Sequence, residues 1–105
     1  MISDRRTHLR YPWPKRCWCQ AREISIYAQI GNVSGGGVFL RTASPLPEGS
    51  AASIRLPLGP DDEEQVVDAV VVWCEEQRGM GLRFVSAPKG FEERLRDLLQ
   101  TLQQR

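Results

Sequence analysis

The sequence is poor in histidine and cysteine, the residues that most often build metal and catalytic sites. Its 105 residues include one histidine, His8, and three cysteines, Cys17, Cys19 and Cys74. An odd number of cysteines argues against a disulfide framework, and C-x-C with one distant cysteine lacks a usual zinc spacing. A single histidine also leaves no Ser-His-Asp or Cys-His set to assemble. We therefore expect no metal site, no catalytic residues and no enzymatic activity.

Long apolar runs are also missing. No stretch approaches the ~18 apolar residues of a membrane-spanning helix. The opening segment MISDRRTHLR is charged and lacks the apolar core of a secretory signal. These absences predict a cytoplasmic protein with no membrane insertion. A chain of this length fits one domain, and its 41% hydrophobic and 26% charged residues are ordinary for a globular protein, so general disorder is not expected.

The net charge of +1 hides an asymmetry along the chain. Residues 1–22 carry six basic side chains and one acidic side chain, a net charge of +5, whereas the remainder carries eight basic and twelve acidic, a net charge of −4. A basic segment on a mildly acidic body suits an anionic partner, although a solvated tail with spare charges fits as well. Pro12 and Pro14 disfavour a helix. We therefore expect residues 1–15 to form an extended or flexible basic arm.

The body reads as short strands followed by one helix. Apolar alternation or strand-forming composition, with turn residues between, occurs over 17–22, 25–31, 38–42, 51–58, 65–74 and 81–85. In the fifth stretch Trp73 shares a face with Val67, Ala69 and Val71, which predicts that Trp73 lies in the core. Residues 16–105 therefore predict a mainly β domain, either a small antiparallel barrel or a sandwich.

The C-terminal segment changes to helical spacing. We expect a helix over about 89–104, whose apolar face is formed by Phe91, Leu95, Leu98, Leu99 and Leu102. A single amphipathic helix of this length can cover one face or one mouth of a sheet.

The stretch NVSGGG at 32–37 stands between two of the predicted strands. Three successive glycines weaken a strand. Asparagine, serine and glycine are ordinary turn residues, so the stretch could be purely structural. The missing Cβ atoms would equally let a ligand approach the backbone closely. Taken alone, the stretch does not decide between these two interpretations.

A second motif favours the ligand-binding interpretation of this stretch. Residues 6–10 have the pattern R-x-x-x-R, and residues 32–37 have the pattern N-x-S-x-x-G. Together with the strand-rich body, the C-terminal helix, VVVW at 70–73 and GMGLRF at 79–84, they resemble the PilZ domain family over nearly the whole chain. The resemblance implies a small six-stranded antiparallel β-barrel with a C-terminal α-helix that binds the bacterial second messenger cyclic di-GMP.

The resemblance also implies which residues form the ligand site. Arg6 and Arg10 would bind the ligand from the arm, and Arg5 occupies a position that favours an intercalated ligand dimer in the family. The full set of candidate ligand-binding residues is Arg5, Arg6, Arg10, Asn32, Ser34, Gly36 and Gly37. An arginine fork fits phosphate oxygens and the O6 and N7 atoms of guanine. Only Gly37 of the three glycines is fixed by the motif, so Gly35 and Gly36 could serve the turn alone.

The implied function is a receptor that changes its surface or arm on binding cyclic di-GMP and signals to a separate protein. A second interpretation is a ligand-independent PilZ-like adaptor in motility, secretion or exopolysaccharide control. A third is a barrel that binds single-stranded nucleic acid, against which the net acidic body and DDEE at 61–64 argue. Trp13 and Trp18 flank the arm and could cover a bound base or serve only as a lid of the barrel. No cofactor besides the ligand is expected.

Overall fold

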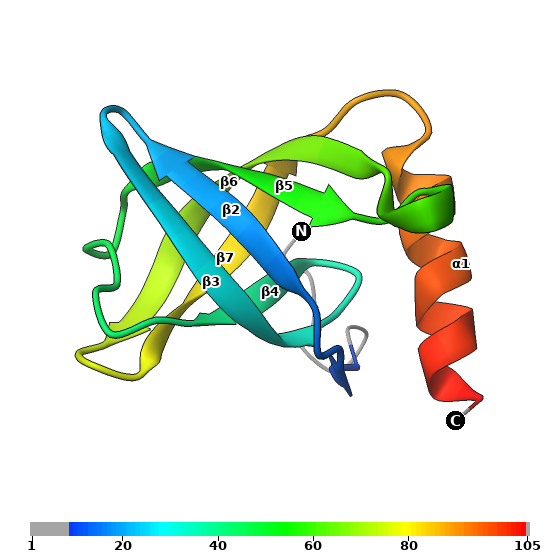
Figure 1. The fold of residues 1–105 in the computed structure, drawn as a ribbon, viewed down its shortest axis with the longest axis horizontal. Helices are drawn as coiled ribbons and strands as arrows, with labels where there is room; N and C mark the ends of the chain where they lie inside the picture. Colours follow the sequence, from blue (N-terminus) through cyan, green and yellow to red (C-terminus); the bar gives the residue numbers. More distant parts are fainter. Residues whose placement is uncertain (1–8, 105) are drawn as a thin grey trace, which may run out of the picture.

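Six antiparallel strands close into a barrel in a computed structural model, which describes residues 9–104 (Figure 1). The strands are β2 (Arg16–Ala21), β3 (Ile24–Val33), β4 (Gly37–Arg41), β5 (Ala51–Pro57), β6 (Glu64–Glu75) and β7 (Gly79–Ser86). They pair in the order β3-β2-β5-β6-β7-β4, and pairing of β3 with β4 closes the ring. The six predicted strands are confirmed to within two residues at each end, and the barrel is the correct alternative to the sandwich.

Alternation along each strand decides which side chains enter the core. In β2, Cys17 and Cys19 are buried, whereas Arg16, Trp18 and Gln20 are exposed. The other strands supply the largest fully buried side chains, which include Ile30, Leu40, Ile54, Leu56 and Met80. The interior of a barrel of this size is therefore filled by side chains and is not a channel.

The prediction that Trp73 lies in the core is wrong. The pairing of β6 with β7 shifts register between Val71, which lies opposite Leu82, and Trp73, which lies opposite Gly81. Such a bulge adds one residue to one strand and reverses the inside–outside alternation beyond it. As a result Trp73 is 43% exposed, and its ring packs against Phe39 with 5.6 Å between ring centroids.

The helix α1 (Phe91–Gln103) stands at one end of the barrel, beside the β5–β6 connection that contains the 3-10 turn η2 (Pro60–Asp62) (Figure 1). Its apolar side faces the barrel, as the spacing predicts. The buried residues of the helix are Phe91, Leu95 and Leu102. The β2–β3 and β6–β7 turns lie at the opposite end. No helix within residues 9–104 is long and apolar enough to span a membrane.

The described end of the predicted arm follows the barrel wall. The two-residue strand β1 (Tyr11–Pro12) pairs antiparallel with β3, and Pro12 lies opposite Asn32. Trp13 is buried in the core, so its indole fills the barrel and is not available to cover a ligand base. The domain boundary at residue 15 stays a prediction.

Candidate ligand-binding site

One hydrogen bond joins the two sequence motifs. The Arg10 guanidinium donates from Nη1 to Oδ1 of Asn32 at 2.9 Å, although 22 positions separate them in the sequence. The pairing of β1 with β3 explains the contact, because it brings the chain alongside Asn32 immediately after Arg10. The bond uses one of the five guanidinium N–H donors, and the amide NH2 of Asn32 has no hydrogen-bond partner among residues 9–104. The pair can therefore bind a further group.

A β-bulge presents Asn32 at the barrel rim. The pairing of β3 with β4 shifts register between Ile30 and Asn32, which leaves Gly31 as the extra residue. A Cβ on Gly31 would lie 2.8 Å from Cδ2 of Phe39, so the glycine makes room for that ring. Bulges commonly re-aim side chains next to functional sites. Here the bulge leaves Asn32 partly exposed, beside Arg10.

Ser34 points into the turn between β3 and β4. Its side chain is buried, and its hydroxyl accepts a hydrogen bond from the Gly36 N–H at 3.2 Å and donates to the Gly37 carbonyl at 3.5 Å. The Ser34 N–H also donates to the Gly37 carbonyl, at 2.9 Å. These local bonds are typical of a serine that shapes a turn. In this structure Ser34 therefore supports the turn that follows Asn32.

Packing within the protein requires glycine at position 37. A Cβ at this position would overlap the Leu82 carbonyl oxygen and lie 3.1 Å from the Leu82 carbonyl carbon. Gly37 thus allows β4 and β7 to pair closely. The preceding Gly36 carbonyl accepts a hydrogen bond from the Phe84 N–H at 2.9 Å, which ties the turn to β7. The geometry gives Gly37 a packing role.

A groove of about 440 Å³ opens between the arm, the β3–β4 turn and α1. Small-molecule sites commonly have volumes of ~300–1,000 Å³. Gly35 is exposed and forms part of the groove wall, so a ligand can approach its backbone. The other lining residues are Leu9 and Tyr11 from the arm and Glu92, Leu95, Arg96, Leu99, Gln100 and Gln103 from α1. The geometry therefore favours Gly35, and not Gly37, as the glycine that faces a ligand.

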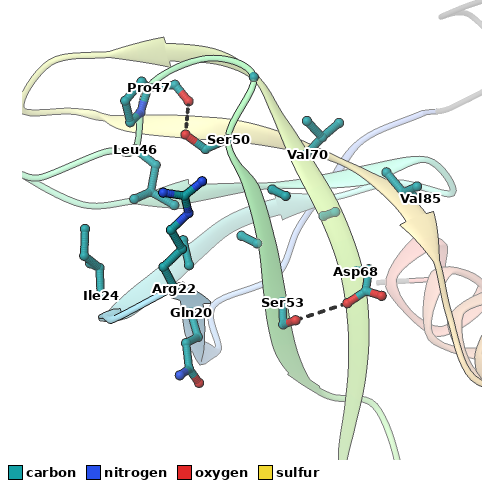
Figure 2. A pocket seen from close by; sticks show the side chains of 15 residues that line it. Gln20, Arg22, Ile24, Leu46, Pro47, Ser50, Ser53, Asp68, Val70 and Val85 are labelled. Atoms are coloured by element: carbon teal, nitrogen blue, oxygen red, sulfur yellow. Dashed lines mark hydrogen bonds between the residues drawn. The ribbon is translucent and has the colours of Figure 1, made fainter.

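A larger groove of about 920 Å³ lies at the opposite end of the barrel (Figure 2). Of its five polar side chains, Ser50, Ser53 and Asp68 form hydrogen bonds within the protein. Ser53 donates to Asp68 at 3.1 Å, and Ser50 donates to the Pro47 carbonyl at 2.6 Å. Neither sequence motif contributes to its lining. The smaller groove is therefore the candidate site, because it is lined by Gly35 of the second motif and by Leu9 and Tyr11, the two neighbours of Arg10 in the sequence.

Two of the predicted site residues, Arg5 and Arg6, lie outside the described residues. The sequence did not indicate that polar residues of α1 form the third wall of the site, Arg96 and Gln100 among them. The only available signal was the polar side of an amphipathic helix, which does not show where that helix packs. Within residues 9–104, no cluster of three or more His, Cys, Asp or Glu side chains could hold a metal ion.

The fold and the site together define a small β-barrel domain in which one residue from each motif forms a hydrogen bond at one rim. A family model described as PilZ domain matches residues 4–101, and the chain belongs to this family. A comparison with curated protein sequences found no significant match.

Solved structures share this fold. The chain is similar to the PilZ domain of YcgR from Escherichia coli with c-di-GMP, at 20% identity and a TM-score of 0.75, over 96% of this chain and 93% of that one. It is also similar to the inhibitor of motility MotI/DgrA of Bacillus subtilis, at 23% identity and a TM-score of 0.74, over 98% of this chain and 51% of that one. MrkH of K. pneumonia in its apo state gives 20% identity and a TM-score of 0.70, over 99% and 53%. The chain thus spans about half the length of MotI and MrkH.

Proposed function

We propose that this chain is a receptor for cyclic di-GMP that signals to a separate protein. The observation that carries the proposal is the hydrogen bond between Arg10 and Asn32, because it brings one residue from each motif together where the arm pairs with β3. A ligand held there would contact the arm and the barrel at the same time. The YcgR domain, which has the same fold, was solved with this ligand.

The residue types suit the two chemical parts of the ligand. Arg10 and, in the proposal, Arg6 would bind phosphate oxygens or the O6 and N7 atoms of guanine through their planar forks. The amide NH2 of Asn32 would donate to an acceptor on a guanine edge. The exposed backbone at Gly35 would allow close approach, and Arg96 of α1 would add positive charge on the opposite wall.

The signal would pass to another protein by a change in the arm and the surrounding surface. Binding would hold the basic arm against the barrel, and such ordering of a segment is a common switching device. The proposal involves no catalytic step and places the protein in the cytoplasm. It assigns no cofactor besides the ligand, and an intercalated ligand dimer remains part of the proposal through Arg5.

Isothermal titration calorimetry with cyclic di-GMP tests the clamp. We expect Arg10→Ala to weaken binding by about 1–3 kcal/mol, which corresponds to roughly 5- to 150-fold. Arg10→Lys keeps the charge but loses the planar fork, so its affinity should fall between those of wild type and Arg10→Ala. Arg78→Ala is the matched control, because Arg78 is exposed and pairs with Glu75 at the opposite end of the barrel.

The stoichiometry of the same titration tests the dimer. Two ligands per chain in the wild type and one in Arg5→Ala would support an intercalated pair. Unchanged affinity in both Arg6→Ala and Arg10→Ala would refute the clamp. Failure of the wild type to bind at high micromolar concentration would instead favour the ligand-independent adaptor.

A further inference from the structure

We propose that the outer wall formed by β2, β3, β4 and β5 is a docking surface for an acidic segment of a partner protein. We call this surface the basic–aromatic face and define it by Arg16, Trp18, Tyr27, Arg41 and Arg55. All five side chains are exposed and alternate with inward-facing core residues along their strands. The inference rests on the proposed function only in assigning this face to the output of the receptor.

An aromatic row crosses the middle of the face. Trp18 lies opposite Tyr27 on β3 and opposite Arg55 on β5, and Arg55 lies opposite Val66 on β6. The Trp18 and Tyr27 rings pack with 4.9 Å between centroids, yet the two residues remain 44% and 54% exposed. Exposed Trp, Tyr and Arg side chains that cluster in this way are the residue types that dominate protein–protein binding energy.

A basic row runs beside the aromatic row. Arg16 and Arg41 both lie opposite Gln29, one from each neighbouring strand. The Arg16 guanidinium carbon lies 5.8 Å from the centre of the Tyr27 ring, a cation–π distance. Neither Arg16 nor Arg41 forms an ion pair with any residue in the described part of the chain, and Arg55 reaches Glu64 only at 3.8 Å. The face therefore presents positive charge that a carboxylate-bearing partner can pair.

The positive charge of the basic–aromatic face also excludes two other occupants, the arm of the same chain and a second copy of the chain. Residues 1–15 of this chain carry four basic side chains and one acidic side chain, so the arm would be repelled by the face. A second copy that docked through the same face would place arginines against arginines, because a two-fold interface is built from identical patches. The complementary partner is therefore a different, acidic protein.

Single-stranded nucleic acid fits this face less well. Proteins that bind it combine a basic groove with rings on which bases stack. Neither Trp18 nor Tyr27 lines either of the two grooves described above. The Tyr27 ring already contacts Trp18 and lies near the Arg16 guanidinium, so a stacked base would have to displace a neighbour. We therefore assign the face to a protein.

The barrel determines how that partner would bind. Both β2 and β3 are hydrogen-bonded on each side, so they offer no free edge for an added strand. Recognition must use side chains. The fitting partner segment is one that places an apolar side chain against Trp18 and carries Asp or Glu on either side to meet Arg16 and Arg55.

Site-specific photo-crosslinking in cells of the source organism tests the assignment. A benzoylphenylalanine replaces Trp18 in one variant and Trp73 in a matched control. Trp73 is as exposed as Trp18 and packs against an aromatic ring in the same way, but it lies on β6. We expect position 18 to crosslink to one protein segment rich in Asp and Glu around an apolar residue. Equal crosslinking from position 73 would overturn the proposal, as would adducts to nucleic acid, to a second copy or to a segment without acidic residues.

Binding of the crosslinked segment as a synthetic peptide provides the second measurement. We expect Trp18→Ala and Arg16→Glu each to weaken binding about tenfold or more, as loss of a hot-spot residue does, and Trp73→Ala to leave it unchanged. Wild-type affinity in both face variants would overturn the proposal. Trp18 does not line the candidate ligand groove, so Trp18→Ala should keep its affinity for cyclic di-GMP. Failure of the docking surface and failure of the proposed receptor function are therefore distinguishable.

Discussion

Replacing Gly37 by alanine separates a folding role from a ligand-binding role within NVSGGG. The added Cβ would overlap the Leu82 carbonyl oxygen and lie 3.3 Å from Cα of Arg83. Both neighbours are backbone atoms of β7, so no side chain can rotate away. Relief requires β4 and β7 to move apart along their paired length.

The size of the effect follows from overpacking. Extra atoms forced into a packed site cost typically ~1–3 kcal/mol, and here the strain falls on a strand pair that helps to close the barrel. For a domain of about 100 residues, each kcal/mol lowers Tm by roughly 4–8 °C. We therefore expect Gly37→Ala to lower Tm by on the order of 10 °C. Exposed Gly35, which does not have a positive φ, should accept alanine within about 0.5 kcal/mol.

Thermal unfolding followed by circular dichroism, with and without cyclic di-GMP, provides the assay. Gly79→Ala is the matched control, because a Cβ there would overlap the Leu40 carbonyl oxygen at the far end of the same β4–β7 ladder. We expect Gly37→Ala and Gly79→Ala to be destabilised alike, and Gly35→Ala to lose ligand affinity at unchanged stability. A Gly37→Ala protein with wild-type Tm and no ligand binding would refute this division of roles.

The buried thiols of β2 give two further predictions. Burial, helped by neighbouring Cys19 and Glu64, raises the pKa of Cys17 from 9.0 to about 12, and burial raises the pKa of Cys19 to about 11. Above pH 9 the unfolded chain loses thiol protons that the native state keeps, so stability should fall by up to about 1.4 kcal/mol per pH unit for each thiol. Denaturant titrations between about pH 8 and 10.5 would check this, and Cys19→Val should flatten the slope. In the native protein we expect Ellman's reagent to label the partly exposed Cys74 quickly, and the buried Cys17 and Cys19 only on unfolding. Equal labelling rates for the three cysteines would contradict the burial of Cys17 and Cys19.

The sequence predicted the barrel well because its strands follow simple alternation between punctuating turns. The same rule failed at Trp73, because a bulge is a property of two strands together and leaves little trace in one of them. Gly81 opposite Trp73 was the available signal, since glycine inside a strand often marks a bulge or a close approach. Gly31, the extra residue at the bulge between β3 and β4, fits the same rule.

The candidate site was predictable in its motifs but not in its construction. The resemblance to the PilZ family implied that Arg10 and Asn32 act together, and the structure places them in a hydrogen bond. The sequence could not show that the Ser34 side chain points inward, or that the β7 backbone fills the space where a Cβ of Gly37 would lie. Both features depend on which strand lies next to β4. The groove wall supplied by α1 depends on where the helix docks, which is also a long-range property.

The two proposed surfaces lie on one strand, and this limits how they can communicate. Tyr27 and Asn32 are five positions apart on β3, or roughly 17 Å at about 3.3 Å per residue. That distance is about twice the ~8 Å Debye length at physiological salt, so neutralising charge at the ligand would be felt only weakly at Tyr27. A shift of the strand itself would have to break pairing with β2 and β4 together. The coupling between ligand and partner must therefore run through a part of the chain that can change its contacts without opening the barrel.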